Sequence, residues 1–377
     1  MTDPRTTPLH ARHEALGASF TDFGGWLMPV RYTSDLAEHK AVREAAGLFD
    51  ISHMAEFLVE GPDAGALLDH ALAGRLSTLV DDQAKYSLLL AEDGGIIDDV
   101  IVYRDGAETF LVVANAGNHD PVAEALVERA ADFDATVHDA TDEFALIAVQ
   151  GPVSQVVLES TPALHVDGAL GDLRYYRKVG ARFALADGTA APVHVARTGY
   201  TGEDGFELYV PVTAAVEVWD ALAAAGEPLG LVPAGLAARD TLRLEAGMPL
   251  YGHELSRDVV PAQAGLGRVV VFDKGDFVGR DALSAVIAAD APVLVGLVSE
   301  GRRAGRAGYA VFDGAGDEAA QVGTVTSGAL SPTLGHPIAL AYVTPAASAV
   351  GTELHLDVRG TRIPATVTAP PFYRRKK

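Results

Sequence analysis

Cysteine is absent from this chain of 377 residues. Without thiols we expect no disulfide bond, zinc–thiolate site, iron–sulfur cluster or cysteine nucleophile. Long apolar runs are also missing, since no segment approaches the roughly 18 consecutive apolar residues of a membrane-spanning helix. The N-terminal residues carry both charge signs and no apolar core, so we expect no signal peptide and a cytoplasmic protein without membrane contact.

Basic residues are scarce, with 29 Lys and Arg against 51 Asp and Glu and a formal net charge of -22. Nucleic-acid binding needs clustered Lys and Arg on the phosphates, so this balance argues against a nucleic-acid partner. Arg302, Arg303 and Arg306 nevertheless lie close together in the sequence. They form either an ordinary solvated group of charges or a docking patch for an acidic protein.

Several common catalytic motifs are missing from the sequence. There is no GxxxxGK[ST], no HExxH and no GxSxG segment, which weighs against P-loop enzymes, zinc metalloproteases and α/β-hydrolases. The twelve histidines show no metal-ligand spacing, so we expect no metal site. We interpret His53 and His253, which follow apolar stretches, as structural histidines.

Hydrophobic periodicity and turn residues indicate a mixed chain of two or three domains. Residues 34–46 predict a helix with Ser34 as its N-cap and Gly47 as its stop. Strands and helices alternate over residues 54–150 in a way that predicts a compact α+β unit, and a similar unit follows. The remaining segments predict a small antiparallel barrel or sandwich: VLVGLVS, AGYAVFD, QVGTVTSG, IALAYV, TELHLDV and TRIPATVT.

Two adjacent carboxylates, Asp98 and Asp99, interrupt the segment GGIIDDVIVY, which otherwise predicts a buried strand. Neighbouring side chains on a strand point to opposite faces, so one Asp must face each way. An ionised carboxylate in an apolar interior is costly unless it is paired or hydrogen-bonded. The strand therefore has either one hydrated face or a pocket that one of the carboxylates lines.

The segment RTGYTGEDGFELYV combines a glycine-rich connection with an alternating strand. Phe206, Leu208 and Val210 share one face of that strand, which leaves Glu207 on the other face. Glu207 is either an exposed surface carboxylate or an acceptor for a planar N–C–N edge. A carboxylate accepts two parallel hydrogen bonds from such an edge, which guanidinium and pterins both present.

Two further segments have a structural and a functional interpretation. Arg239 and Arg243 lie four residues apart on one face of a predicted helix, near Asp240 and Glu245. They form either salt bridges within the helix or a clamp for the anionic tail of a substrate. Tyr86 precedes three leucines and is either a core side chain or a stacking platform.

Together these segments resemble one family closely, the T-protein, or aminomethyltransferase, of the glycine cleavage system. The resemblance extends from about Arg5 to Tyr373, and the segments follow one another in the family's order. The matching segments are DFGGWLMPVRY, REAAGLFDISHMAEF, YSLLLAEDGGIIDDVIVY, AVQGP, RTGYTGEDGFE, GLAARDTLRLEAGMPLYGHEL and TSGALSPTLGHPIALAYV.

The resemblance implies an α+β fold, a three-domain ring of two ferredoxin-like units and a C-terminal antiparallel β-barrel. The implied domains are residues 1–53 with 152–279, the inserted residues 54–151, and the barrel at 280–377. The implied reaction transfers a one-carbon unit from the aminomethyl-lipoyl arm of H-protein to tetrahydrofolate. Its products are 5,10-methylenetetrahydrofolate and ammonia, so the expected partners are lipoylated H-protein and a folate.

The resemblance also assigns roles to individual residues. Asp99 takes the position of the family's catalytic carboxylate, Glu207 that of the glutamate on the pterin, and Arg239 that of the arginine on the anionic folate tail. The other implied folate-binding positions are Tyr86, Asp98, Val113, Asn115, Tyr200 and Arg374.

Two related functions stay open beside the aminomethyl transfer. A folate-dependent demethylase of the same architecture would act on a small methylated donor. A non-catalytic folate-binding protein for iron–sulfur assembly would carry a cysteine-containing KGCYxGQE motif, and this chain has no cysteine.

Overall fold

The computed structural model describes residues 3–284 and 290–375. The chain divides into two compact units, and the three-domain division implied above stays a prediction. The first unit comprises Met1–Asp69, Leu76–Tyr86 and Val100–Arg239, and the second His70–Arg75, Ser87–Asp99 and Asp240–Lys377. In the described ranges, no helix is both long and apolar enough to cross a membrane.

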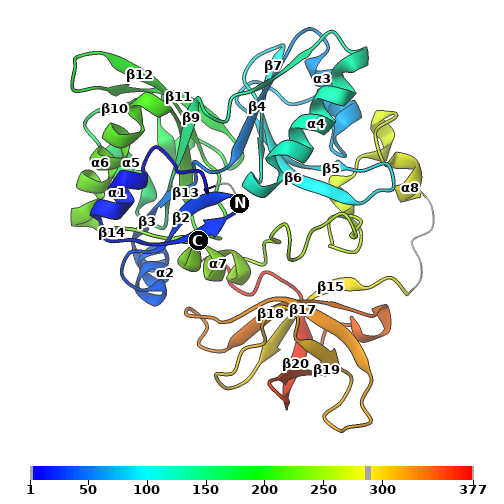
Figure 1. Ribbon diagram of the computed structural model, residues 1–377. Helices are drawn as coiled ribbons and strands as arrows, with labels where there is room; N and C mark the ends of the chain where they lie inside the picture. Colours follow the sequence, from blue (N-terminus) through cyan, green and yellow to red (C-terminus); the bar gives the residue numbers. More distant parts are fainter. Residues whose placement is uncertain (1–2, 285–289, 376–377) are drawn as a thin grey trace. The chain divides into compact units, whose positions relative to one another are not determined.

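A seven-stranded sheet dominates the first unit (Figure 1). Neighbouring strands are antiparallel except for the last pair, which is parallel. In spatial order the strands are β10 (Leu164–Val166), β11 (Lys178–Ala184), β12 (Ala190–Ala196), β13 (Gly205–Pro211), β9 (Phe144–Gln150), β3 (Ala46–Asp50) and β14 (Leu231–Pro233).

Helices α5 (Ser154–Glu159) and α6 (Ala215–Gly226) pack on this sheet, and both contact β13. On α6 the buried side chains Val218, Trp219 and Leu222 recur at the helical spacing of three and four residues. This spacing directs one apolar face of the helix onto the sheet. These side chains enter a core that also contains the inward-facing side chains of β13. This shared core fixes the position of β13.

The N-terminal segment adds helix α1 (His10–Ala15), the hairpin of β1 (Ser19–Phe23) and β2 (Trp26–Arg31), and helix α2 (Asp35–Glu44). The helix predicted over residues 34–46 is present, but its predicted end is wrong: it ends at Glu44, and Ala46 and Gly47 already belong to β3, so Gly47 is not its stop. Its N-cap is Ser34, whose side chain accepts a hydrogen bond from the Ala37 amide at 3.1 Å.

A five-stranded sheet has the order β5 (Ala84–Leu90), β6 (Ile96–Arg104), β7 (Thr109–Ala114), β4 (Ala55–Glu60) and β8 (Thr136–Asp139). Helices α3 (Ala64–Ala71) and α4 (His119–Arg129) lie beside it (Figure 1). The remaining helices are α7 (Leu236–Glu245) and α8 (Arg280–Ser284).

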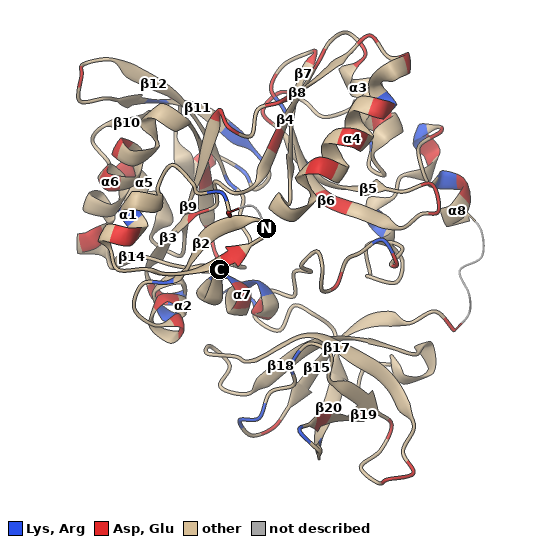
Figure 2. Cartoon of the chain, in the orientation of Figure 1, with Lys and Arg blue, Asp and Glu red and all other residues tan. Residues whose placement is uncertain are grey.

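The six C-terminal segments form a closed barrel, as the spacing of short strands predicts. On β19 the alternating residues Leu354, Leu356 and Val358 are buried in its core. Figure 2 shows few charged residues on the barrel strands, and most of the charges lie in loops. The strand order is β15 (Val293–Ser299), β18 (Pro337–Val343), β17 (Gln321–Leu330), β16 (Ala310–Phe312), β19 (Glu353–Val358) and β20 (Thr361–Thr368).

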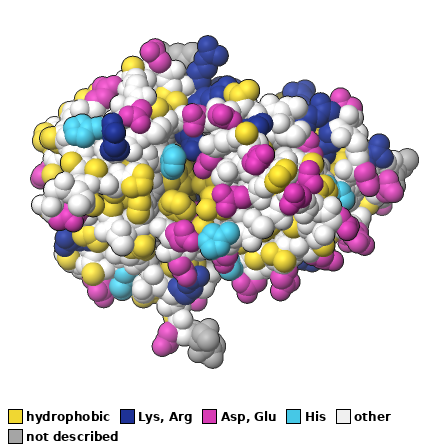
Figure 3. Space-filling view, turned by 90° about the horizontal axis from the view of Figure 1, so that it is seen from above, with side chains coloured by type: hydrophobic (Ala, Val, Ile, Leu, Met, Phe, Trp, Pro, Cys, Tyr) yellow, Lys and Arg dark blue, Asp and Glu magenta, His cyan; other side chains and the backbone are white. Residues whose placement is uncertain are grey.

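The acidic composition appears on the surface as dispersed charge. Figure 3 shows Asp and Glu side chains scattered among uncharged ones on one face, without a single acidic patch. Dispersed charge of one sign favours solubility and identifies no ligand by itself.

Candidate active site

The connection between β12 and β13, residues 197–204, is clamped at both ends by one ion pair. Arg197 donates to both carboxylate oxygens of Asp204, with distances of 3.0 Å from Nε and 2.6 Å from Nη2. This bidentate geometry is the strongest form of the Arg–carboxylate interaction. The loop therefore has a defined conformation before any ligand binds.

The glycines of this connection make room for the side chain of Gln150. A Cβ atom at Gly199 would lie 2.0 Å from Gln150 Oε1, and one at Gly205 would lie 2.4 Å from Nε2. The Gln150 amide donates to the Thr198 carbonyl at 3.1 Å and accepts from the Thr201 hydroxyl at 3.0 Å. A side chain at either position would displace the Gln150 amide from these hydrogen bonds, which explains the glycines at positions 199 and 205.

Glu207 lies on β13, where every residue from Gly205 to Val210 is buried. The interpretation of Glu207 as an exposed surface carboxylate is therefore wrong, because its side chain is only 9% exposed. Oε2 accepts a hydrogen bond of 2.5 Å from the Thr198 hydroxyl. Within the described part of the chain, Oε1 has no hydrogen-bond partner.

Burial raises the pKa of Glu207, while the bond from Thr198 and the charge of Arg239 oppose that rise. The guanidinium of Arg239, on α7, lies 4.8 Å from the centre of the Tyr200 ring. Tyr200, Glu207 and Arg239, which the sequence singled out separately, are thus brought together in the first unit. A buried acceptor, an aromatic ring and a cation are the groups that a flat heterocycle with an anionic tail requires.

Tyr103 and Tyr209 are buried close enough to Glu207 to feel its charge, and the sequence did not indicate either of them as a site residue. The Tyr103 hydroxyl is 3.2 Å from the Thr198 hydroxyl, and the two tyrosine rings meet edge to face at 5.4 Å. Burial raises the pKa of Tyr103, as does the nearby Glu207 carboxylate. In the sequence, a tyrosine in an apolar strand cannot be distinguished from an ordinary core residue.

Arg243 differs from Arg239, although it lies one helical turn away. Its side chain is 1% exposed and donates to Glu254 at 2.8 Å and to Ser327 at 2.7 Å. The Nε atom of Arg243 also donates to Asp240 Oδ1 at 2.9 Å. The salt-bridge interpretation is correct for Arg243, and the idea that it clamps a substrate is wrong.

The carboxylate pair lies in the second unit, on the first half of β6. Asp98 is fully buried and Asp99 is half-buried. Their different burial agrees with the expectation that the two side chains point to opposite faces of the strand. Gly95, in the turn before β6, has no room for a Cβ atom, which would lie 2.0 Å from the Arg257 carbonyl oxygen. The Tyr251 hydroxyl donates to the Ile96 carbonyl at 3.1 Å. Burial and the charge of Asp98 raise the pKa of Tyr251.

The other predicted folate-binding positions are spread over several elements. Tyr86 is half-buried on β5, so it is not a fully enclosed core side chain. Val113, on β7, is 7% exposed and pairs with Ile101 of β6. Asn115 follows β7 and is half-buried, whereas Arg374 is exposed beyond the end of β20.

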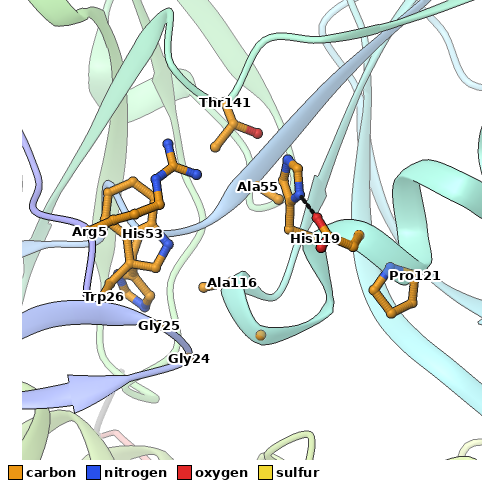
Figure 4. Close-up of a pocket in the computed structure, with 12 residues that line it drawn as sticks. Arg5, Gly24, Gly25, Trp26, His53, Ala55, Ala116, His119, Pro121 and Thr141 are labelled. Atoms are coloured by element: carbon orange, nitrogen blue, oxygen red, sulfur yellow. Dashed lines mark hydrogen bonds and ion pairs between the residues drawn. The ribbon is translucent and has the colours of Figure 1, made fainter. Parts of the chain in front are cut away.

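The first unit contains a cavity of about 360 Å³ (Figure 4). One of its lining residues, Ala116, directly follows Asn115 in the sequence. Trp26 and His53 line one side, and Ala116 and His119 lie across from them. Partial burial disfavours the charged form of His119, but hydrogen bonds to two aspartates outweigh this effect and raise its pKa. The bonds join its ring nitrogens to Asp120 and Asp139, both at 2.7 Å.

His53 is 2% exposed, and its Nδ1 atom is buried without a hydrogen-bond partner in the described residues. Burial and the charge of Arg239 lower its pKa to about 4, so the ring is neutral at pH 7. We expected His53 to be a structural histidine with its hydrogen bonds satisfied. Its Nδ1 atom departs from this expectation. His253 does bond, through Nδ1, to the Thr326 carbonyl at 3.0 Å.

A basic pocket of about 470 Å³ lies on the barrel, lined by Arg303, Arg306 and Arg359. Arg306 donates to the Gly328 carbonyl at 3.0 Å. Neither Arg303 nor Arg359 has a carboxylate partner among residues 3–284 and 290–375. Three arginines around one hollow are unusual in a chain with a net charge of -22.

Family models match both parts of the chain. The GCVT N-terminal domain matches residues 9–274, and the glycine cleavage T-protein C-terminal barrel domain matches residues 293–374. The chain belongs to the glycine cleavage T-protein family. The family assignment agrees with the resemblance seen in the sequence and with the closed barrel.

T-protein relatives are similar over their whole length. An aminomethyltransferase from Cutibacterium acnes is 55% identical, with 100% of each chain covered. One from Streptomyces coelicolor is 56% identical, covering 100% of this chain and 99% of its own. The crystal structure of glycine cleavage system aminomethyltransferase T from Bartonella henselae has a TM-score of 0.87 and 37% identity, with 99% of both chains covered.

The chain is therefore an enzyme, an aminomethyltransferase of the glycine cleavage system. The predicted mixed fold with a C-terminal antiparallel barrel is confirmed, and so is the transferase function. The T-protein family is folate-dependent and works within the glycine cleavage system.

Proposed function

We propose that this T-protein uses tetrahydrofolate as its acceptor and the aminomethyl-lipoyl arm of H-protein as its donor. In the transfer, the C–S bond to the arm and the C–N bond to the departing amine break. Two C–N bonds form, to N5 and N10 of the folate. The two protons released from these nitrogens balance the new thiol of the arm and the ammonia.

The observation that carries the folate proposal is the buried carboxylate of Glu207, whose Oε1 accepts no hydrogen bond from any residue that the structure describes. The bond from Thr198 occupies one acceptor position on Oε2, which leaves acceptor capacity on both oxygens. Two parallel hydrogen bonds from the aminopyrimidinone edge of a pterin fit such a group. The Tyr200 ring then offers an apolar contact, and Arg239 offers a cation for the carboxylates of the folate tail.

Asp99 is the proposed catalytic residue. Its half-buried carboxylate on β6 can hold the proton that leaves the folate nitrogen and pass it on as the new bond forms. Tyr86, Asp98, Val113, Asn115 and Arg374 are proposed as further folate-binding positions.

The Asp99→Asn and Glu207→Ala variants test the two roles separately. Asp99→Asn should bind tetrahydrofolate as well as the parent enzyme but release ammonia about 10²–10⁴-fold more slowly, the usual contribution of general acid–base help. Glu207→Ala should mainly weaken equilibrium binding, because it leaves the pterin edge unpaired. An unchanged rate for the first variant, or unchanged binding for the second, contradicts the role concerned.

The basic pocket of the barrel is the proposed contact for H-protein, because opposite charge steers encounter with an acidic partner. Arg303→Glu and Arg359→Glu should raise the apparent KM for H-protein and make it less sensitive to salt. Arg174→Glu is the control, since it makes the same charge change at an exposed position of the first unit. Equal effects at all three positions contradict the proposed contact.

A further inference from the structure

A short hydrogen-bonded chain ends on the Glu207 carboxylate. The Thr198 hydroxyl lies between the Tyr103 hydroxyl, at 3.2 Å, and Glu207 Oε2, at 2.5 Å. Thr198 is 2% exposed and Tyr103 is fully buried, so bulk water does not compete for these bonds. The three residues come from β6, the 197–204 connection and β13.

The chemistry of the groups gives this chain one direction. An ionised carboxylate can only accept hydrogen bonds, so the single proton of the Thr198 hydroxyl points to Glu207. The oxygen of Thr198 then accepts from the Tyr103 hydroxyl. A donor that itself accepts a hydrogen bond is polarised and binds its acceptor more strongly.

The backbone of Thr198 is itself held in place. Its carbonyl accepts from the buried Gln150 amide at 3.1 Å, and Arg197 beside it forms the fork with Asp204. The β-branched side chain adds a restricted χ1 torsion. The Thr198 hydroxyl is thus a donor at a defined position, and no rearrangement is needed to present it.

We infer that Thr198 and Tyr103 are positioning residues for folate recognition, which hold the Glu207 carboxylate so that Oε1 faces an incoming pterin edge. This inference rests on the proposed role of Glu207 as the pterin acceptor. Neither hydroxyl needs to touch the ligand. Their effect is to keep a buried carboxylate in one orientation and to favour its ionised form against burial.

Single substitutions measure the contribution of each hydroxyl to the tetrahydrofolate dissociation constant. Thr198→Val removes the hydroxyl at nearly constant shape and should weaken binding about tenfold, the equivalent of one hydrogen bond to a charged group. Thr198→Ser keeps the donor and should bind like the parent enzyme. Tyr103→Phe acts one bond further away and should weaken binding by a smaller factor. Parent-like binding by both Thr198→Val and Tyr103→Phe overturns the inference.

A double-mutant cycle separates positioning from a general loss of packing. If Thr198 acts through Glu207, Thr198→Val should add no further loss of affinity in the Glu207→Gln background. A full additional loss there shows an independent effect and overturns the inference. The apparent KM for H-protein should stay unchanged in Thr198→Val and Tyr103→Phe.

The same variants distinguish failure of the positioning role of Thr198 and Tyr103 from failure of the folate role of Glu207. Weak binding by Glu207→Gln together with parent-like binding by Thr198→Val and Tyr103→Phe leaves the folate role of Glu207 standing and rejects the positioning role. Parent-like binding by Glu207→Gln rejects both. Thermal unfolding of each variant shows whether affinity is measured on folded protein, and Tyr103→Phe provides the answer if Thr198→Val does not fold.

Discussion

Arg239 and Arg243 offer a matched pair, because the same substitution at two positions of one helix should have opposite consequences. Arg239→Met should weaken tetrahydrofolate binding and cost less stability than Arg243→Met, since Arg239 is half-buried whereas Arg243 is almost fully buried. Arg243→Met should destabilise the protein and leave the folate affinity of the folded enzyme unchanged.

The size of the Arg243 effect follows from its neighbours. Glu254 is completely buried and loses its charge partner, which typically costs about 3–5 kcal/mol. Asp240 is 55% exposed and adds less than about 1 kcal/mol, because water screens that pair. For Arg239→Met, the loss of a charged hydrogen bond to the folate tail corresponds to about 1.5–3 kcal/mol, or roughly ten- to a hundredfold in affinity.

Chemical denaturation and equilibrium folate titration of both variants provide the measurement. The reasoning fails if Arg243→Met unfolds at the same denaturant concentration as the parent. It also fails if the folded Arg243→Met protein loses as much folate affinity as Arg239→Met.

Two further predictions concern Gly199 and His53. Gly199→Ala forces a Cβ atom onto the Gln150 side chain and should weaken folate binding at least tenfold in titrations, whereas Gly106→Ala, with nothing within 4 Å, should not. The pKa of His53 is lowered from 6.5 to about 4 in the folded protein, so the unfolded chain binds more protons between these pH values. The free energy of unfolding should therefore rise with pH across this window, and His53→Gln should flatten denaturation profiles recorded at several pH values. An unchanged profile contradicts the assignment.

Much of the fold could be predicted from local sequence. The six barrel segments alternate or run apolar between turn residues, and Ser34 supplies a cap that acts within one helical turn. The RTGYTGEDGFE segment similarly indicates a tight, glycine-dependent connection before its strand. Such signals survive in a linear sequence because their physical causes act between residues close together in the chain.

The site was predicted less completely, because its groups act through neighbours far apart in the chain. Thr198 lies in the RTGYTGEDGFE segment, whose pattern assigns it no role, and Tyr103 lies in a segment that predicts an ordinary strand. Their proposed role emerges only when β6 and the 197–204 connection bring the Tyr103 hydroxyl to Thr198 and the Thr198 hydroxyl to Glu207. His53 is similar, since its low pKa depends on burial and on the charge of Arg239.

The sequence by itself determined the T-protein family, the succession of strands and helices, and the identity of the chemical groups available to the enzyme. Only the tertiary structure decided which of two arginines one turn apart is buried in an ion pair and which stays beside Tyr200. The physical reason is that hydrophobic periodicity and turn chemistry are local. Burial, which determines whether a charge needs a protein partner or can meet a ligand, depends on every segment that packs around it.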